Sequence, residues 1–134
     1  MKATAKGIIL SLTDEMKPVF VLADRFRIRQ VLVNLIVNSV KYGKEYGETK
    51  VRFHDLGNNI SIEISDNGIG IDKEHLPRLF ERFYRVDKSR SREQGGTGLG
   101  LAIVKHIIEA HNQTINVMST AGVGTVFTFT LKKG

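Results

Sequence analysis

One stretch of the chain, RQVLVNLIVNSVKYG from Arg29 to Gly43, most constrains what the sequence can fold into. Apolar side chains wrap most of its helical circumference, which predicts a helix buried against the rest of the domain. Asn34 and Asn38 interrupt this wrapping four residues apart, so they lie one above the other on one face, and Lys41 and Tyr42 follow one turn later. The polar strip is either the solvated edge of the helix or part of a site, because buried amides need hydrogen-bond partners. The rest of the chain favours a site.

The composition is that of a single globular domain. The chain has 134 residues, of which 41% are hydrophobic and 25% charged, and this length can bury a core without disulfides. The absence of cysteine excludes disulfides and thiolate metal sites, and is consistent with a reducing compartment. The apolar run near Ile8–Leu12 is too short for a signal peptide or a membrane span. We therefore expect one domain over residues 1–134, with any membrane attachment through segments outside this sequence.

The net charge of +6 suggests an anionic ligand. Several basic residues fall within eleven positions, but only Phe83 and Tyr84 are interleaved as aromatics and no DNA-reading motif flanks them. A phosphorylated small molecule is therefore a more economical partner than nucleic acid, which we do not expect to bind. The basic residues are Arg82, Arg85, Lys88, Arg90 and Arg92.

The alternation of helical and extended patterns predicts an α/β (α+β) two-layer sandwich. We expect a mixed sheet of about five or more strands, covered on one face by about three helices. A hairpin signal around Gly57 argues against a doubly wound parallel sheet. Strands are predicted over Ile8–Leu12, Val19–Leu22, Lys50–His54, Asn59–Ser65, Thr114–Met118 and Thr125–Leu131. Helices are predicted from the cap residue Asp24 to about Tyr42, over Lys73–Phe80, and over Leu99–Ala110 with core spacing at Leu99, Ile103 and Ile107. Lys44–Thr49 is predicted to be a loop.

Two glycine-rich segments can place backbone close to a ligand. Gly95–Gly100 directly precedes the last predicted helix, and its spacing fits neither a dinucleotide fingerprint nor a P-loop. Its backbone amides and the helix N-terminus can nevertheless hold phosphate oxygens, with a ligand-free hinge as the alternative. In the second segment, Asp66–Gly70, a carboxylate at the end of a strand can accept a hydrogen bond from a base amino group. An ordinary Asp-Asn-Gly turn is the alternative there.

Five segments in order carry a family resemblance. NLIVNSVKYG, DNGIGI, LFERFYRVD, GGTGLGLAI and GTVFTF resemble the N, G1, F and G2 boxes and the last strand of the ATP-binding catalytic domain of two-component sensor histidine kinases. That family belongs to the superfamily that includes gyrase, Hsp90 and MutL. The resemblance covers nearly the whole chain, and five boxes in this order are specific where each alone is weak.

The resemblance implies ATP and Mg²⁺ as cofactors and gives roles to the polar strip. Asn38 is similar to the asparagine whose oxygen holds Mg²⁺, a hard cation that prefers oxygen ligands. Asn34 would support the metal and phosphates from one turn earlier, and Lys41 would reach a phosphate. Tyr42 would pack near the ribose and base.

The resemblance also implies an adenine pocket and a flexible lid over about residues 84–96. Asp66 would take the adenine amino group, with Thr125 reading the base through water. Phe80 and Phe83 would anchor the base of the lid, and Arg85 would face the phosphates. The remaining nucleotide contacts are expected from Gly68 and Gly70 by close approach, from Ile71 and Leu101 as pocket walls, and from Gly96, Thr97, Gly98, Leu99 and Gly100 around the phosphates.

Two departures from the family pattern bear on the reaction. Asn34 stands where ATP-hydrolysing relatives carry the glutamate that activates water, which argues for phosphoryl transfer to a protein over hydrolysis. The segment His111-Asn112-Gln113-Thr114 replaces a glycine pair that the kinases often show after the histidine. We expect this second departure to affect only its own turn.

None of the four histidines lies in a motif resembling the phosphoacceptor segment, and no two have metal-ligand spacing with a third partner in reach. The resemblance therefore implies a histidine kinase catalytic domain whose acceptor histidine lies on a separate helical dimerisation domain, with a response regulator downstream. Its expected location is the cytoplasmic end of a membrane-bound bacterial sensor. The alternatives are a stand-alone serine kinase, such as an anti-sigma factor, and a nucleotide-sensing pseudokinase. The histidines are His54, His75, His106 and His111.

Overall fold

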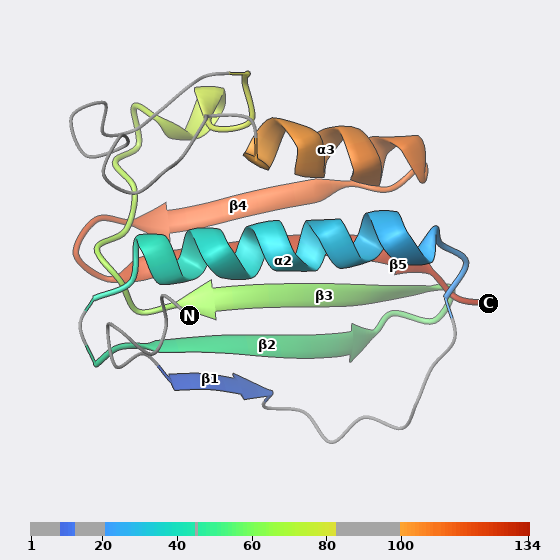
Figure 1. Cartoon of the computed structure of the whole chain (residues 1–134), viewed down its shortest axis with the longest axis horizontal. Coiled ribbons are helices and arrows are strands. Elements are labelled where there is room, and N and C mark those ends of the chain that lie inside the picture. The colour runs from blue at the N-terminus through green and yellow to red at the C-terminus, as the bar shows by residue number, and fades with distance from the viewer. Residues whose placement is uncertain (1–8, 13–20, 45, 83–99) are drawn as a thin grey trace.

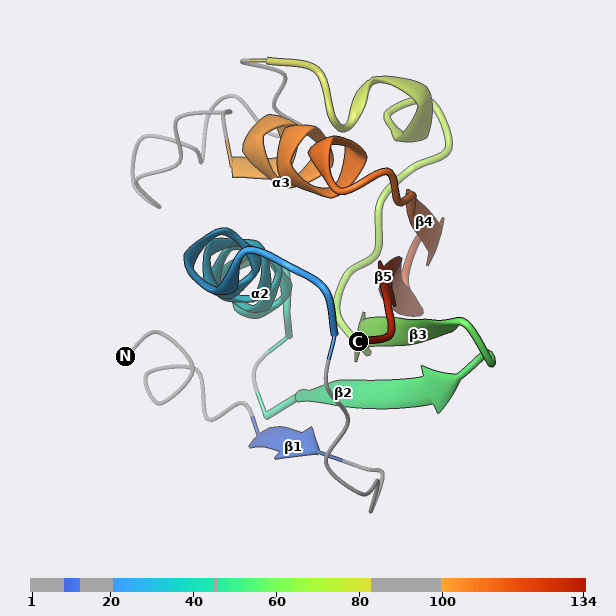
Figure 2. The same cartoon turned by 90° about the vertical axis from the view of Figure 1, so that its right-hand side faces the viewer.

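The computed structural model describes residues 9–12, 21–44, 46–82 and 100–134. In these ranges two α-helices are present. They lie on one face of a β-sheet, as Figures 1 and 2 show from directions 90° apart. The predicted two-layer α/β architecture is confirmed. In chain order, the elements are β1 (Ile9–Leu12), α2 (Arg25–Lys41), β2 (Glu48–Asp55), β3 (Asn59–Asp66), the 3-10 helix η1 (Leu76–Arg78), α3 (Gly100–Ala110), β4 (Ile115–Thr120) and β5 (Gly124–Lys132).

The strands are ordered β1-β2-β3-β5-β4 across the sheet. Strands β2, β3, β5 and β4 pair antiparallel, whereas β1 pairs parallel with β2. The chain reaches β2 from β1 through α2, because a parallel pair needs a crossover connection. A tight hairpin joins β2 to β3, as predicted, with the Gly57 amide donating to Asp55 Oδ1 at 2.9 Å.

Helix α2 begins at a side-chain cap and buries one face. The Asp24 carboxylate accepts the amides of Phe26 and Arg27 at 3.0 and 3.1 Å, which confirms the predicted cap. The residues buried from α2 are Val31, Leu35, Ser39 and Val40. The expectation of a helix buried nearly all round was wrong: Val33 and Val37 are 50% and 46% exposed. A single helical layer covers the sheet, so the outer face of α2 remains exposed to solvent.

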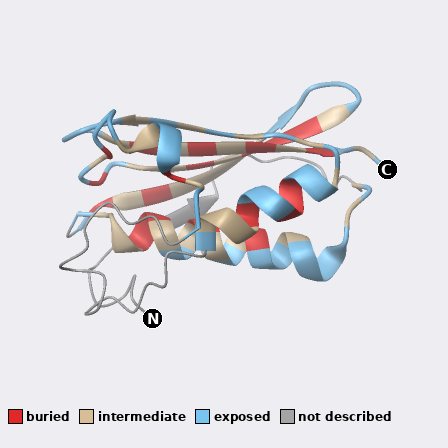
Figure 3. Ribbon diagram, turned by 90° about the horizontal axis from the view of Figure 1, so that it is seen from above, coloured by how far each residue is buried: buried red, intermediate tan, exposed pale blue. Residues whose placement is uncertain are grey.

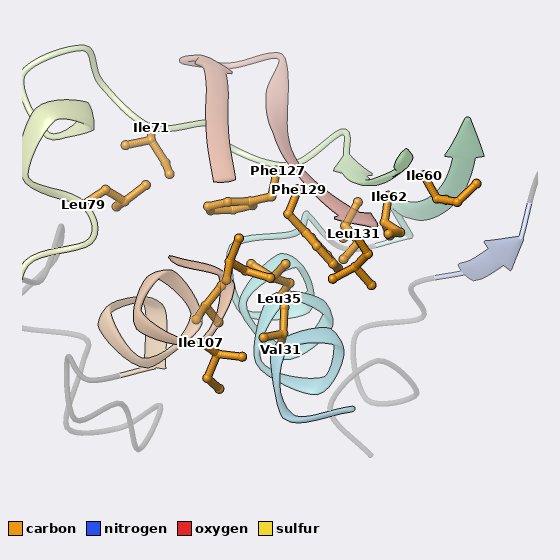
Figure 4. Close-up of a cluster of buried hydrophobic side chains, with 13 residues drawn as sticks. Val31, Leu35, Ile60, Ile62, Ile71, Leu79, Ile107, Phe127, Phe129 and Leu131 are labelled. Carbon is orange, nitrogen blue, oxygen red and sulfur yellow. The ribbon is translucent and has the colours of Figure 1, made fainter. Parts of the chain in front are cut away.

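The hydrophobic core lies between the two helices and the sheet (Figures 3 and 4). Strand β5 alternates along its length, and its buried side chains Phe127, Phe129 and Leu131 face the helices. Helix α3 contributes Val104, Ile107 and Ile108, so its core face is rotated from the Leu99-Ile103-Ile107 spacing that the sequence suggested. No helix in the described ranges has the length and apolar character needed to cross a membrane.

Two predicted elements differ in the structure. The helix expected over Lys73–Phe80 is a 3-10 helix limited to Leu76–Arg78. Pro77 lacks an amide proton and cannot donate an intrahelical hydrogen bond, which disfavours a longer helix. The strand expected over Val19–Leu22 falls partly outside the described residues, and Val21 forms an isolated bridge with Lys133.

Candidate functional site

A row of polar side chains crosses four strands at one end of the sheet, on the face that the helices cover. Thr49 of β2 pairs with Asp66 of β3, Asp66 pairs with Thr125 of β5, and Thr125 pairs with Ser119 of β4. We call Thr49, Asp66, Thr125 and Ser119 the polar row. Thr49 and Thr125 are 1% and 3% exposed. Buried polar groups require partners, so a row of them inside an apolar layer indicates a built site.

Asp66 is the charged member of the polar row and is surrounded by donors. Its Oδ1 accepts the Gly68 amide at 2.9 Å, and its Oδ2 accepts the hydroxyl of Ser39, from the C-terminal part of α2, at 3.3 Å. Ser39 Oγ also lies 2.8 Å from Thr49 Oγ1. A hydroxyl has one proton to donate. Since Ser39 gives its proton to Asp66, Thr49 must be the donor to Ser39.

Burial raises the pKa of the Asp66 carboxyl, while hydrogen bonds from the Gly68 amide, the Ser39 hydroxyl and the Thr125 backbone oppose that rise. The folded state therefore holds the Asp66 proton more tightly than the unfolded chain does. As the pH rises from the usual carboxyl range through this raised pKa, ionisation of Asp66 lowers the free energy of unfolding. A carboxylate whose ionisation destabilises the fold, yet which is surrounded by hydrogen-bond donors, is typical of a functional site.

Replacing Ser39 with alanine is expected to raise the pKa of Asp66 further, because it removes a donor that stabilises the ionised carboxylate. A ligand that donates to the carboxylate would then lose affinity at a higher pH than with the unaltered chain. Adenine-nucleotide affinity measured over a pH series tests this prediction. Asn116→Ala, a substitution on the surface of β4, is the control. Coincident pH profiles for Ser39→Ala and the unaltered chain would contradict it.

The turn after Asp66 packs tightly against two other segments. A Cβ atom on Gly68 would lie 2.2 Å from the Tyr42 carbonyl oxygen, and one on Gly70 would lie 2.1 Å from the Thr120 carbonyl oxygen. Gly70 also has a φ of +72°, which side chains disfavour. Both glycines were predicted to allow the close approach of a ligand, whereas in the structure they allow the close approach of the chain's own backbone.

The predicted pocket walls lie next to this turn or in the core. Ile71 is 2% exposed, and its amide donates to Ser119 Oγ at 2.7 Å. Leu101 is half-buried and packs against the core. Phe80 meets Phe127 edge to face with ring centroids 6.2 Å apart. Ile71 is thus fixed to the polar row through Ser119.

The polar strip of α2 leads from the middle of the helix toward the Asp66 end of the sheet. Asn34 Nδ2 lies 3.5 Å from the Gly100 carbonyl oxygen, a long contact that links α2 to the start of α3. Asn38 is half-buried, and its side chain makes no hydrogen bond with the described part of the chain. Lys41 Nζ lies 5.4 Å from the centroid of the Tyr42 ring. Tyr42 joins the site through its carbonyl oxygen, which accepts the Ile69 amide at 3.1 Å.

The structure therefore brings one group of predicted residues together and leaves another group undescribed. Asp66, Thr125 and Ile71 meet through the polar row, and Gly68, Gly70 and Tyr42 form the adjoining turn. Gly100 is the exposed first residue of α3, and no atom of the described residues lies within 4 Å of where its Cβ would be. The residues that lie outside the described ranges are Phe83, Arg85, Gly96, Thr97, Gly98 and Leu99.

Sequence reasoning missed Ser39, Thr49 and Ser119. Ser39 stood in the segment that was compared with the kinase box, but its contact with Asp66 needs the packing of α2 on β3. Thr49 was assigned to a loop, although β2 begins at Glu48. Strand register places Thr49 beside Asp66 and Ser119 beside Thr125. Both pairs lie in hairpins, whose register depends on the turn, so the two turns were the signal that could have found them. Only the pairing of β3 with β5, which joins the two hairpins, is between non-consecutive strands.

His111, which precedes the departure from the family pattern, contacts residues outside its own turn. His111 Nε2 accepts the Asp24 amide at 3.0 Å, and Nδ1 lies 2.8 Å from the Ile107 carbonyl oxygen. Nδ1 must carry the proton, because a carbonyl oxygen only accepts and Nε2 is already an acceptor. This neutral tautomer connects the end of α3 to the cap of α2.

The structure also brings Asp72, Glu74 and His75 together, with ligand atoms within 4.8 Å of one another. Histidine spacing in the sequence does not predict this cluster, because two of its three members are carboxylates. Both acidic residues are exposed, and the His75 ring already lies 3.4 Å from Glu74 Oε1. Exposed groups of this kind are common without a metal, so we assign no metal site here.

Comparison with known proteins decides the family. Residues 23–134 match the family described as histidine kinase-, DNA gyrase B-, and HSP90-like ATPase. The chain belongs to this family. Within the family its relatives are sensor kinases: the phosphate regulon sensor protein PhoR of Pseudomonas aeruginosa is 46% identical over 101 residues, which cover 75% of this chain and 23% of that protein. Sensor protein kinase WalK of Staphylococcus aureus is 47% identical over 119 residues, covering 86% of this chain and 28% of WalK.

The sensor-like histidine kinase SenX3 of Mycolicibacterium smegmatis is 40% identical over 131 residues, covering 97% of this chain and 34% of SenX3. The chain thus spans about a quarter to a third of the length of these relatives. Among solved structures, the catalytic domain of histidine kinase ThkA is similar with a TM-score of 0.83 and 30% identity, covering 98% of this chain and 83% of that one. Full-length ShkA in complex with AMPPNP has a TM-score of 0.83 and 29% identity, covering 99% of this chain and 27% of ShkA.

Proposed function

We propose that this chain is the catalytic domain of a sensor histidine kinase, which binds Mg-ATP and passes the γ-phosphoryl group to a histidine on a separate dimerisation domain. The observation that carries the proposal is the polar row, with a carboxylate of raised pKa held by Ser39, Gly68 and Thr125. This site lies in a domain whose family includes ATP-binding enzymes.

The chemistry of the polar row fits an adenine base. Asp66 would accept a hydrogen bond from the 6-amino group, since an ionised carboxylate only accepts. Thr125 would contact the same edge of the base from the neighbouring strand. Ile71 and Leu101 supply apolar surface for the ring, and Gly68 and Gly70 allow the turn between them to lie close to α2 and β4.

The polar strip of α2 fits the phosphates and the metal. The Asn38 amide oxygen is a ligand of the kind Mg²⁺ prefers, and no hydrogen bond to the described residues occupies it. Asn34 would support the metal and phosphates, and Lys41 would neutralise phosphate charge. We extend the proposal to the undescribed residues: Phe83 anchoring a lid over about residues 84–96, Arg85 facing the phosphates, and the backbone of Gly96, Thr97, Gly98, Leu99 and Gly100 holding them.

Bound ATP would supply the phosphoryl group, so the work of this chain is positioning and charge neutralisation. Asn34 lacks the acid–base chemistry of a carboxylate, which leaves water without an activating group at that position. We therefore propose transfer to a protein histidine over hydrolysis. The stand-alone serine kinase and the pseudokinase are not favoured, because PhoR, SenX3 and WalK are all named as sensors or sensor kinases.

The partners belong to the same proposal. ThkA has been solved in complex with the response regulator protein TrrA, and the ThkA chain in that complex is similar to this chain with a TM-score of 0.79 and 28% identity. We infer a response regulator as the downstream partner here and a helical dimerisation domain as the source of the acceptor histidine. The expected location of the domain is the cytoplasmic side of a membrane-bound sensor.

The direct test adds the partner that the chain needs. The domain is incubated with Mg-ATP and a dimerisation domain carrying its acceptor histidine, and phosphohistidine is measured, with the histidine replaced by glutamine as the control. We expect phosphohistidine only when the histidine is present. Nucleotide binding without transfer would favour the pseudokinase, and absence of Mg-dependent nucleotide binding would reject the nucleotide site altogether.

Replacing Asn38 with alanine is expected to remove most of the Mg²⁺-dependent part of ATP affinity, by roughly tenfold or more, because an oxygen ligand of the metal is lost. Affinity for ATP measured in excess chelator should change little. Titration calorimetry with and without Mg²⁺ separates the two quantities, and Asn116→Ala, an exposed asparagine of β4, is the matched control. Normal Mg-ATP affinity in Asn38→Ala would show that the metal ligand lies elsewhere.

A further inference from the structure

We infer that Ser119 is a specificity-determining positioning residue, which selects a 6-amino purine over a 6-oxo purine by fixing the hydroxyl proton of Thr125. The inference rests on the proposed nucleotide site and goes beyond it, because Ser119 acts through Thr125. Ser119 lies on β4 at the end of the polar row, two strands away from Asp66. Nothing in the kinase resemblance singled it out.

Ser119 Oγ has three close partners that use its complete hydrogen-bonding capacity. It lies 2.7 Å from the Ile71 amide nitrogen, 3.0 Å from the Gly124 carbonyl oxygen and 2.7 Å from Thr125 Oγ1. A serine hydroxyl donates one proton and accepts at two lone pairs. The amide can only donate, and the carbonyl can only accept. Ser119 therefore accepts from Ile71 and donates to Gly124, so the remaining contact requires Thr125 to be the donor.

This assignment determines what Thr125 can offer to a ligand. Once its proton is directed to Ser119, Thr125 Oγ1 presents only lone pairs. Asp66, the register neighbour of Thr125, receives donors from Gly68 and Ser39 and is itself an acceptor when ionised. The two central members of the polar row therefore both present acceptors to a base.

An acceptor-only row discriminates between purines. A 6-amino group donates protons to these acceptors, whereas a 6-oxo group places a further acceptor opposite them at the same position. Sites built to hydrogen-bond one substrate group strongly reject an analogue that cannot make the bond. Without Ser119, the Thr125 hydroxyl is free to rotate and can donate to a 6-oxo group. Asp66 would still prefer the amino group, so selectivity should fall without being lost.

The test compares the affinities of Mg-ATP and Mg-ITP, since inosine carries a 6-oxo group and an N1 proton but lacks the 2-amino group of guanine. Titration calorimetry on the unaltered chain and on Ser119→Ala gives the ATP-to-ITP affinity ratio for each. We expect the ATP-to-ITP affinity ratio to narrow by roughly tenfold in Ser119→Ala, because Thr125 can then donate one hydrogen bond to the 6-oxo group of ITP. Ser119→Thr, which keeps the hydroxyl, should restore the ratio of the unaltered chain.

A second variant makes the inference independent of how well Ser119→Ala folds. Thr125→Val keeps the shape of the side chain but removes the hydroxyl, so it should narrow the ratio mainly by weakening ATP binding. Ser119→Ala added to Thr125→Val should change the ratio no further, because the proton that Ser119 positions is gone.

The outcomes separate this inference from the proposed function. A uniform loss of affinity for both nucleotides in Ser119→Ala would give Ser119 a purely structural role and overturn the inference, as would an unchanged ratio in Thr125→Val. An unaltered chain that binds neither nucleotide would instead reject the proposed function.

Discussion

Replacing Asp66 with asparagine is expected to abolish useful adenine-nucleotide affinity while the domain stays folded. The variant replaces a charged acceptor with a neutral amide, whose NH₂ group cannot accept a hydrogen bond from a ligand. Hydrogen bonds to charged groups contribute more free energy than hydrogen bonds between neutral groups, so binding of a ligand that donates to Asp66 is weakened. The expected loss is about 2–4 kcal/mol of binding free energy, a factor of roughly thirty to a thousand in Kd.

The stability of Asp66→Asn distinguishes a binding role from a structural one. Burial raises the pKa of Asp66, so at neutral pH its ionised form costs the folded state free energy that asparagine does not. We expect the free energy of unfolding at neutral pH to be unchanged or higher in the variant. Calorimetric binding and denaturant melts measure the two quantities, and Asp72→Asn, an exposed carboxylate in the following loop, is the control. A variant that binds normally would refute the assignment of Asp66.

Replacing Gly70 with alanine is expected to destabilise the domain by about 2–4 kcal/mol. The residue has a φ of +72°, and its added Cβ would lie 2.1 Å from the Thr120 carbonyl oxygen. The clashing atom is backbone at the turn between β4 and β5, whose Gly122 amide donates to the Ile69 carbonyl at 2.7 Å. Relief of the clash must therefore displace either the turn after Asp66 or the β4–β5 turn.

Gly100→Ala is the matched control for Gly70→Ala. Gly100 begins α3 and is exposed, and its added Cβ would meet no atom of the described residues within 4 Å. Alanine favours helix over glycine, so this variant should be as stable as the unaltered chain or slightly more stable. Thermal or urea unfolding of both variants measures the difference. Equal stability of Gly70→Ala and the unaltered chain would show that the turn adapts, contrary to the structure.

The strongest local patterns in the sequence predicted the parts of the fold that depend on neighbouring residues. The Asp24 cap and the hairpin at Gly57 were predicted correctly, because caps and tight turns are governed by a few adjacent residues. The helix expected over Lys73–Phe80 was predicted from pattern alone and is a short 3-10 helix around Pro77. Burial of α2 was overestimated, because apolar composition does not report how many layers cover a helix.

Asp66 and Thr125 could be identified as candidate site residues from sequence through the family resemblance, but their environment could not. Thr49 and Ser119 join them only because β2, β3, β5 and β4 align in one register. The raised pKa of Asp66 likewise depends on burial beneath the helical layer. The sequence also could not show why glycine is needed at positions 68 and 70, because the backbone atoms that leave no room for a side chain there belong to distant segments.

The sequence by itself determined the family of this protein, most of its helices and strands, and the identity of the carboxylate in the polar row. The helices and strands follow from local periodicity, whereas the family and the carboxylate follow from the resemblance of ordered motifs. Only the tertiary structure decided which hydroxyls surround that carboxylate and where their protons point. Hydrogen-bond direction depends on every partner of Ser39, Ser119 and Thr125 at once, and those partners meet only when four strands and a helix pack together.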